Sequence, residues 1–411
     1  MSPPAQSSFA ALRYRDFRLL WLGQIVSVTG SQMQFVAINW HVYLLTQSPL
    51  ALGLVGLFRG LPIIVCSLAG GVVADALDRK KLMMVTQTVM LISAGLLTAF
   101  TMAGVQSVWP IYVLSGLASA ASAFDVPARQ SLMPTLVPPE VFPNAVSLGL
   151  LVFNVATIVG PAIAGFLHAE SGPALIYGLN AGSFVAVLIA LILMHTSGDP
   201  ERGVARRDAL SLAALKEGFR FVWKTPIIVQ TMTLDFAATF FASATLLLPI
   251  FAKERLHVDA RGYGFLAAAP AIGSVITALV MARLGSFQRQ GRLVVASVAI
   301  FGFATAAFGV STVFWFSLLM LAVTGASDTV STVLRQTIRQ LVTPNHLRGR
   351  MTSINMMFFM GGPQLGELEA GVLAGFIGAP LSVVIGGAGS LISAAIAAVK
   401  SKSLMQFEIK E

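Results

Sequence analysis

Long runs of apolar residues alternate with short polar segments along the whole chain. We predict twelve membrane-spanning helices, because each run is close to the length of about 20 residues that crosses about 30 Å of hydrocarbon. The runs lack the period-two alternation that would indicate a membrane barrel. The predicted spans are 18–46, 50–74, 82–104, 108–127, 143–167, 173–194, 226–251, 262–284, 293–311, 313–334, 351–377 and 379–399. This pattern predicts an all-α membrane protein.

The longest polar segment divides the spans into two groups of six. It covers residues 195–225 and contains Gly198, Pro200 and several charges. We therefore expect a cytoplasmic N-terminal arm, a six-helix bundle, a cytoplasmic linker, a second six-helix bundle and a cytoplasmic tail. Their predicted bounds are 1–17, 18–194, 195–225, 226–399 and 400–411.

The two halves carry similar residues at equivalent places. Arg129 and Arg335 are each followed by glutamine and, nine residues on, by a proline, and they lie half a chain length apart. Asp125 and Asp328 stand just before them. Tandem halves with the same topology are typical of secondary transporters, so we predict two pseudo-symmetric six-helix halves.

Composition and charge support a membrane protein and exclude other classes. Hydrophobic residues make up 56% and charged residues 11%, whereas soluble domains average about 45–50% and about 25%. The net charge of +9 would suggest nucleic acid in a soluble protein. With the N-terminus inside, however, the predicted cytoplasmic segments hold all but four of the 27 lysines and arginines: Arg59, Lys253, Arg255 and Arg261. This asymmetry obeys the positive-inside rule.

These observations bound the partners of the chain. We expect a bacterial cytoplasmic (inner) membrane protein with both termini in the cytoplasm, a monomer that contacts the lipid bilayer and a small-molecule substrate and binds no nucleic acid. The single cysteine, Cys66, allows no internal disulfide and no cysteine-based metal cluster. We expect no metal site.

The loop between the second and third spans carries the most specific motif. It reads Gly71-Val-Val-Ala-Asp75-Ala-Leu-Asp78-Arg79-Lys80-Lys81 and resembles the Gly-x-x-x-Asp-x-x-Gly-Arg-Lys signature of the major facilitator superfamily. Asp78 stands where the family usually has glycine. The resemblance implies the major facilitator fold and a gating role for the loop residues Gly71, Asp75, Asp78, Arg79 and Lys80. The alternative is a plain loop that only sets topology.

Other segments resemble one branch of that superfamily, the drug exporters that include enterobactin and macrolide exporters. They are Phe17-Arg18-Leu-Leu-Trp21, Gly218-Phe219-Arg220-Phe221 and Leu347-Arg348-Gly349-Arg350. Gly160, Pro161 and Gly165 resemble part of an antiporter motif, with Ala164 in place of one expected glycine. The resemblance implies export of drug-like compounds by proton antiport and alternating access, with the proton gradient as energy source and no cofactor. The chain also lacks a phosphate-binding Gly-x-x-x-x-Gly-Lys-Ser/Thr loop, and we expect it not to be an enzyme.

Four charged residues lie deep within predicted spans, where charge is costly and is functional by default. They are Arg59, Asp235, Glu367 and Glu369. We expect Arg59 to pair with Glu367 or Glu369, with Asp235 as the next candidate. Asp235 is the first candidate for the proton carrier and Glu367 the second. The alternative is a static ion pair that fixes packing.

Nearer the cytoplasmic ends, we expect Asp125 and Asp328 to pair with their local arginines, Arg129 and Arg335, and to brace an inner gate. Candidate residues of a substrate cavity are Gln34, Phe35, Asn39, Trp40, Phe240 and Met357. Helix packing through small residues and lipid contact are the alternatives for these positions. Rival functions are a dedicated siderophore or metabolite exporter, a facilitator or importer without proton coupling, and a receptor or scaffold that transports nothing.

Overall fold

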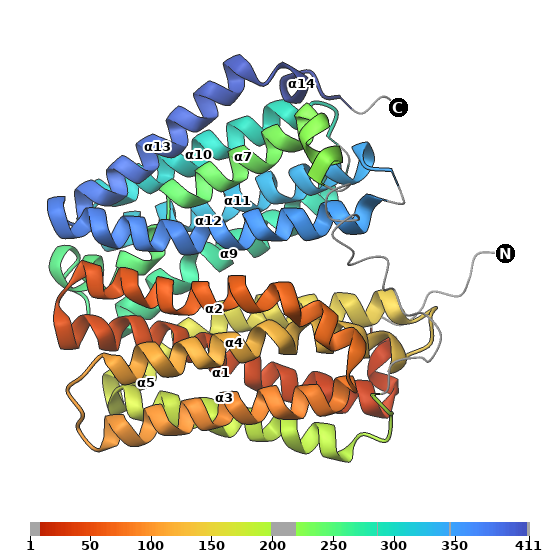
Figure 1. Cartoon of the computed structure of the whole chain (residues 1–411). Coiled ribbons are helices and arrows are strands. Elements are labelled where there is room, and N and C mark those ends of the chain that lie inside the picture. Colours follow the sequence, from red (N-terminus) through yellow and green to blue (C-terminus); the bar gives the residue numbers. More distant parts are fainter. Residues whose placement is uncertain (1–8, 199–218, 286, 345–346, 409–411) are drawn as a thin grey trace. The chain divides into compact units, whose positions relative to one another are not determined.

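The structure is a computed structural model that describes residues 9–198, 219–285, 287–344 and 347–408. Helix side chains are described except at 67–72, 74–76, 244, 348–350, 352–353 and 356–361. Every regular element in these ranges is a helix (Figure 1). The chain divides into two compact units, and each is described by itself.

Unit 1 comprises Met1–Leu45 and Leu61–Gly203. It begins with the short 3-10 helix η1 (Ala10–Arg13), and a second one, η2 (Met133–Thr135), follows its fourth long helix. The long helices are α1 (Arg15–Thr46), the later part of α2 (Pro49–Ala76), α3 (Arg79–Met102), α4 (Trp109–Leu132) and α5 (Phe142–Leu193). The core near the ends of α1 and α4 includes Phe17, Leu20, Met83 and Leu132, all nearly inaccessible to solvent.

Unit 2 comprises Thr46–Gly60 and Val204–Glu411, so it takes the first part of α2. Its other helices are α7 (Pro226–Phe241), η3 (Ala244–Leu247), α8 (Leu248–Ile250), the π-helix η4 (Phe251–Arg255), α9 (Ala260–Leu284), α10 (Gln290–Val310), α11 (Phe314–Val342), α12 (Arg348–Ile377), α13 (Ala379–Lys400) and α14 (Lys402–Met405). Helix α14 packs back on the bundle, where the side chain of Gln230 accepts hydrogen bonds from Ser403 and Leu404.

Helix α5 contains two predicted spans, and Gly172 separates them. Its φ of 71° lies in the left-handed region, which favours glycine. Pro173 follows it, and a proline disfavours helical backbone at the residue before it. The predicted spans at 143–167 and 173–194 therefore meet at a backbone break between them.

The predicted span at 226–251 coincides with a candidate membrane span at Pro226–Arg255, but it is not one regular helix. Helix α7 ends at Phe241, and the chain continues through 3-10 and π turns to Arg255. Two causes are visible at the break. Ser243 Oγ donates to the carbonyls of Thr239 and Pro363, so it competes with the regular backbone bonds. Pro249 then removes a backbone donor two residues into α8.

The predicted span at 313–334 is too short, since α11 continues to Val342. Arg335 and Arg339, which the sequence assigns to a cytoplasmic loop, lie inside this helix and are buried. Charge marks the end of a span only when it faces water, and both arginines have polar partners in unit 2. The extension also moves Asp328 from the inner half of its span to the middle of its helix.

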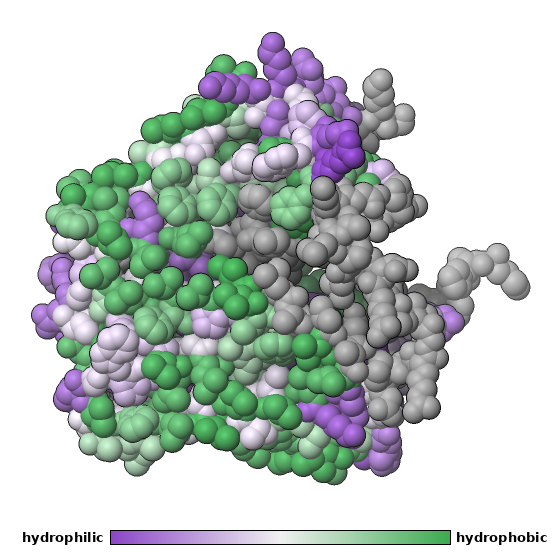
Figure 2. All heavy atoms as spheres, viewed as in Figure 1, coloured by the Kyte–Doolittle hydropathy of each residue, from purple (hydrophilic) through white to green (hydrophobic). Residues whose placement is uncertain are grey.

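Nine helices in the described part of the chain are long and apolar enough to cross a bilayer. Their outer surface is apolar, as Figure 2 shows for one face. Leu381, Ile392 and Val399 on α13, for example, are more than half exposed, at 56%, 59% and 75%. Such continuous apolar surface would aggregate in water. The chain is a multi-pass membrane protein.

Candidate functional site

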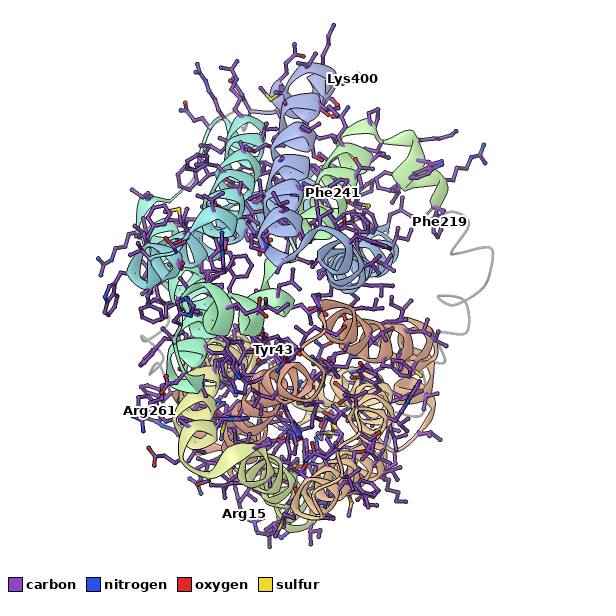
Figure 3. All side chains as sticks on the ribbon, turned by 90° about the vertical axis from the view of Figure 1, so that its left-hand side faces the viewer. Arg15, Tyr43, Phe219, Phe241, Arg261 and Lys400 are labelled. Carbon is purple, nitrogen blue, oxygen red and sulfur yellow. The ribbon has the colours of Figure 1, made fainter. Side chains whose placement is uncertain are left out.

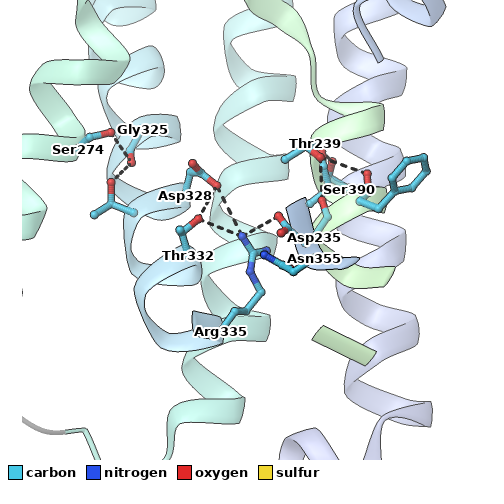
Figure 4. Close-up of polar contacts among 12 residues, drawn as sticks. Asp235, Thr239, Ser274, Gly325, Asp328, Thr332, Arg335, Asn355 and Ser390 are labelled. Carbon is cyan, nitrogen blue, oxygen red and sulfur yellow. Dashed lines mark hydrogen bonds and ion pairs between the residues drawn. The ribbon is translucent and has the colours of Figure 1, made fainter. Parts of the chain in front are cut away.

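A cluster of charged side chains lies inside unit 2 around Arg335 (Figure 4). The Arg335 Nη2 atom is 2.8 Å from Asp235 Oδ1 of α7 and 3.9 Å from Asp328 Oδ1 of its own helix. The side chains of Arg335 and Asp235 are 1% and 4% exposed, whereas that of Asp328 is 48% exposed. One arginine therefore faces two carboxylates, and only one of them is substantially exposed.

The spacing of polar residues on α11 builds this cluster. Asp328, Thr332, Arg335 and Arg339 follow one another at intervals of four, three and four residues, which places them on one helix face. The Thr332 hydroxyl accepts from Arg335 Nη2 at 3.1 Å and lies 3.5 Å from Asp328 Oδ1. It therefore joins the arginine to the more exposed acid.

Arg339 extends the cluster by one turn toward α12. Its Nη1 donates to Asn355 Oδ1 at 2.6 Å, and the arginine is buried. Two carboxylates and two guanidinium groups thus share the interior of unit 2, and their charges cancel when both acids are ionised. A neutral set of this kind is the form in which a protein interior tolerates charge.

Tight packing of α9 against α11 supports the same region. A Cβ atom on Gly325 would lie 1.9 Å from the carbonyl oxygen of Pro270, so only glycine fits there. Ser274 Oγ is 3.0 Å from that carbonyl and 3.0 Å from the carbonyl of Gly325, within hydrogen-bonding distance of both. Gly325 lies one turn before Asp328, so this contact fixes the helix that carries the acid.

Arg59 and Glu367 form a second charged group in unit 2. Glu367 is buried, and it is the charged residue that acts on Arg59. A Cβ on Gly56 would lie 2.6 Å from Glu367 Oε2, and one on Gly60 would lie 2.6 Å from the Cβ of Gln364. The first part of α2 therefore lies directly against α12. Glu369, two residues on, is half-buried and faces elsewhere.

Asp125 and Arg129 in unit 1 are not paired as we expected. Asp125 Oδ1 accepts from Thr86 Oγ1 and Gln87 Nε2 of α3, each at 2.9 Å. Arg129 donates instead to Gln24 Oε1 of α1. Neighbouring helices offer each group a partner, so the interaction within α4 does not form. The equivalent acids of the halves thus differ: Asp125 has neutral donors, and Asp328 has an arginine.

The predicted cavity residues lie in different surroundings. Gln34 Oε1 accepts from Asn180 Nδ2 at 2.7 Å, and both side chains are buried. Asn39 is buried, and neither of its amide atoms has a hydrogen-bond partner among the residues that the structure describes. Trp40 packs edge-on against His168 with ring centroids 6.2 Å apart. Phe35 belongs to the same helix.

In unit 2, Phe240 stacks on Phe236 with centroids 5.8 Å apart and meets Phe241 edge-on at the end of α7 (Figure 3 labels Phe241). The side chain of Met357 lies outside the described residues. A cavity role for these residues stays a prediction.

The loop motif is described from Asp78 onward, and its predicted residues Gly71 and Asp75 are outside the part whose side-chain surroundings the structure describes. Asp78 caps α3, because its Oδ1 accepts from the backbone N–H groups of Lys80 and Lys81 at 2.9 and 3.1 Å. Its φ is −58°, which any residue can adopt. The usual glycine is therefore not required for backbone freedom.

This loop is bound to the segment that follows α5. Lys80 Nζ donates to the carbonyl of Met194 at 2.7 Å, and the N–H of Arg79 donates to the carbonyl of Gly198 at 2.9 Å. A Cβ on Gly198 would lie 2.2 Å from Asp78 Oδ1. The first residues of the predicted linker are therefore part of unit 1.

Asp16 binds the same segment from α1, ahead of the first predicted span. Its Oδ2 accepts from the backbone N–H groups of His195 and Thr196 and from the Thr196 hydroxyl. Burial alone would raise the pKa of Asp16, but these three bonds outweigh it and hold the pKa below its usual value.

The antiporter-like residues lie at a close contact between α5 and α1. A Cβ on Gly160 would be 2.6 Å from the Cβ of Gln32. Pro161 lies inside α5, and both it and Gly165 are buried. Their visible role is helix packing.

Comparisons with known proteins place this geometry in a family. The family model described as "transmembrane secretion effector" matches residues 6–409. The chain belongs to this family of major facilitator transporters. The resemblance expected from the sequence is confirmed, and the protein is a transporter, not an enzyme.

Relatives and solved structures agree with that assignment. The enterobactin exporter EntS of Shigella boydii serotype 18 (strain CDC 3083-94 / BS512) is 28% identical over 377 residues, covering 92% of this chain and 89% of the relative. The structure of a POT family transporter in complex with 5-aminolevulinic acid has a TM-score of 0.78 at 11% identity, covering 98% and 99% of the two chains. That of the nucleoside transporter NupG has a TM-score of 0.71 at 16% identity, covering 94% and 99%. The structures establish the fold, and the family and its exporter relative support export.

Proposed function

We propose that this chain is a secondary exporter of the bacterial cytoplasmic membrane that exchanges protons for hydrophobic or amphipathic small molecules. It works as a monomer with twelve spans in two pseudo-symmetric halves, both termini in the cytoplasm and alternating access. The proton gradient supplies the energy, without a cofactor.

The observation that carries the coupling proposal is the cluster around Arg335. Burying charge within a membrane protein is costly, and a pair of apolar residues would pack unit 2 at lower cost. Retaining two acids on one arginine is useful when one of them changes its charge during the cycle. The accessibility of Asp328 supports that use, because a titrating group must exchange protons with water.

Two features support an amphipathic substrate. The stacked rings of Phe236 and Phe240 offer aromatic surface at the end of α7. The buried amide of Asn39 offers a donor and an acceptor that no described residue satisfies. Aromatic surface with a few polar groups is typical of sites for drug-sized ligands.

A dedicated siderophore exporter is the second candidate, and the name of the enterobactin exporter relative favours it. Both candidates use the same coupling cluster and differ only in the range of compounds carried. A facilitator or importer without proton coupling is the third candidate, and it would give the cluster no role beyond packing.

Everted membrane vesicles that contain the protein test the proposal, because their lumen corresponds to the outside of the cell. Ethidium and enterobactin serve as probes, and vesicles without the protein are the control. We expect accumulation of a probe when the lumen is made acidic and loss of that accumulation when nigericin collapses the gradient. Accumulation of both supports broad export, and accumulation of enterobactin alone supports the dedicated exporter. Flux that ignores the gradient refutes antiport.

A further inference from the structure

The two carboxylates that face Arg335 are not equivalent, and their difference assigns their roles. We infer that Asp328 is the group that binds and releases the transported proton, while Asp235 stays ionised as the fixed partner of Arg335. This inference rests on the proposed proton antiport. It differs from the expectation from the sequence, in which Asp235 was the first candidate for the carrier and Asp328 braced an inner gate.

Access to water separates the two acids. The Asp328 side chain is 48% exposed, against 4% for Asp235. Asp328 also lies at the middle of α11, 14 residues from either end of a helix that runs Phe314–Val342. A charge that faces lipid is costly and rare, so we assign the exposed surface of Asp328 to water. Protons can therefore reach Asp328 without a rearrangement of unit 2.

The distances to Arg335 separate them again. Protonation of Asp235 would remove the contact at 2.8 Å and leave a buried guanidinium with a carboxylate at 3.9 Å. Protonation of Asp328 would leave the contact at 2.8 Å intact. Removing one partner of a buried pair is strongly destabilising, so the proton is taken up by the acid whose loss of charge leaves Arg335 paired.

Thr332 lets the cluster accept either charge state of Asp328. Its hydroxyl is both a donor and an acceptor. It accepts from Arg335 at 3.1 Å and lies 3.5 Å from Asp328 Oδ1. An ionised Asp328 accepts a hydrogen bond from the Thr332 hydroxyl, and a protonated Asp328 donates a hydrogen bond to the Thr332 oxygen. The arginine keeps its contact with Thr332 in both cases.

Among the described side chains, the other helices packed against α11 bring no further charge to Asp328. The charged groups that act on Asp328 are Arg335 and Asp235. Arg339 follows on the same face and is bound to Asn355. The titratable groups of α9 and α10 lie in the terminal turns of those helices: Arg261, Tyr263, Arg283 and Arg292.

Carbodiimide labelling of the whole protein in detergent tests the assignment without a substrate. Dicyclohexylcarbodiimide adds to protonated carboxyl groups within apolar surroundings, and peptide mass spectrometry locates the adduct. We expect an adduct on Asp328 that decreases as the pH rises, and none on Asp235. An adduct on Asp235 with Asp328 unmodified would overturn the inference.

Transport by two variants provides the second test. With Asp328→Asn we expect loss of gradient-driven accumulation of ethidium and enterobactin in everted vesicles, while exchange of a preloaded probe across the membrane persists. With Asp235→Asn we expect loss of both activities, because Arg335 loses its partner. The matched control is Asp259→Asn, since Asp259 caps α9 through two backbone N–H groups and asparagine caps equally well.

The outcomes distinguish this inference from the proposed function. If wild-type flux ignores the gradient, antiport is refuted, and the labelling pattern still decides which acid titrates. If wild-type flux follows the gradient and Asp328→Asn does too, the inference alone is wrong. Loss of exchange with Asp328→Asn, or exchange retained with Asp235→Asn, would also overturn it.

Discussion

The contact between Gly325 and Pro270 makes a sharp prediction for the substitution Gly325→Ala. The added Cβ would lie 1.9 Å from the Pro270 carbonyl oxygen, whereas ordinary contacts begin near 3.4 Å, so α9 and α11 must separate by roughly 1.5 Å there. A backbone carbonyl cannot swing aside as a side chain can. The substitution therefore acts on the distance between the two helices.

The expected loss of stability follows from three contributions. Overpacking of this kind costs about 1–3 kcal/mol, and separating the helices also breaks the contact of Ser274 with the Gly325 carbonyl, worth about 0.5–1.5 kcal/mol. Alanine returns about 1 kcal/mol through its higher helix propensity. We expect a net destabilisation of about 0.5–3.5 kcal/mol.

Unfolding by sodium dodecyl sulfate in mixed micelles, followed by far-UV circular dichroism, measures this difference. Gly95→Ala is the matched control, because Gly95 lies inside α3 with no heavy atom within 4 Å of the added Cβ. That variant should gain up to about 1 kcal/mol. If Gly325→Ala is as stable as Gly95→Ala, the helices are not held at this contact and the reasoning is refuted.

Three further predictions concern the end of unit 1 at which α3 begins. Gly198→Ala should lower the melting temperature in detergent, because its Cβ would lie 2.2 Å from Asp78 Oδ1, and Gly182→Ala, with open space around it, should not; equal effects would contradict the close contact. Asp78→Leu should cost about 1 kcal/mol in chemical denaturation through loss of the N-cap, and Asp78→Asn should cost little; equal losses would exclude capping. The pKa of Asp16 is lower when folded, so its stabilisation is complete above its unfolded value of 3.8 and disappears as the pH falls through the folded value. The difference in melting temperature between wild type and Asp16→Ala should therefore vanish in strong acid, and its persistence would contradict the sign.

Hydropathy located most helices because lipid imposes the same length and composition on every span. It failed where a local contact overrides that rule. Ser243 and Pro249 interrupt an apolar run that looks continuous, and Arg335 continues a helix that its charge seemed to end. These exceptions depend on partners that are distant in sequence, so a scan along the chain does not reveal them.

Its charge within a predicted span identified Asp235 as a candidate residue, but the sequence pattern does not show which residue pairs with it. Asp235 and Arg335 are 100 positions apart, and the packing of α7 against α11 brings them to 2.8 Å. The one usable signal was the polar spacing from Asp328 to Arg339, which continues a helix face past the predicted end of the span. A test of helical spacing among charged residues would have found it.

The cap at Asp78 changes how the family loop signature is best written. Glycine and aspartate differ chemically, yet both are favoured at the N-cap, the residue just before a helix. At a φ of −58° this position needs a residue that starts α3, and it makes no demand for left-handed backbone. A search pattern that allows only glycine rejects this chain for a difference without structural meaning. A pattern that admits serine, threonine, asparagine and aspartate would recover such chains and still exclude those with a bulky apolar residue there.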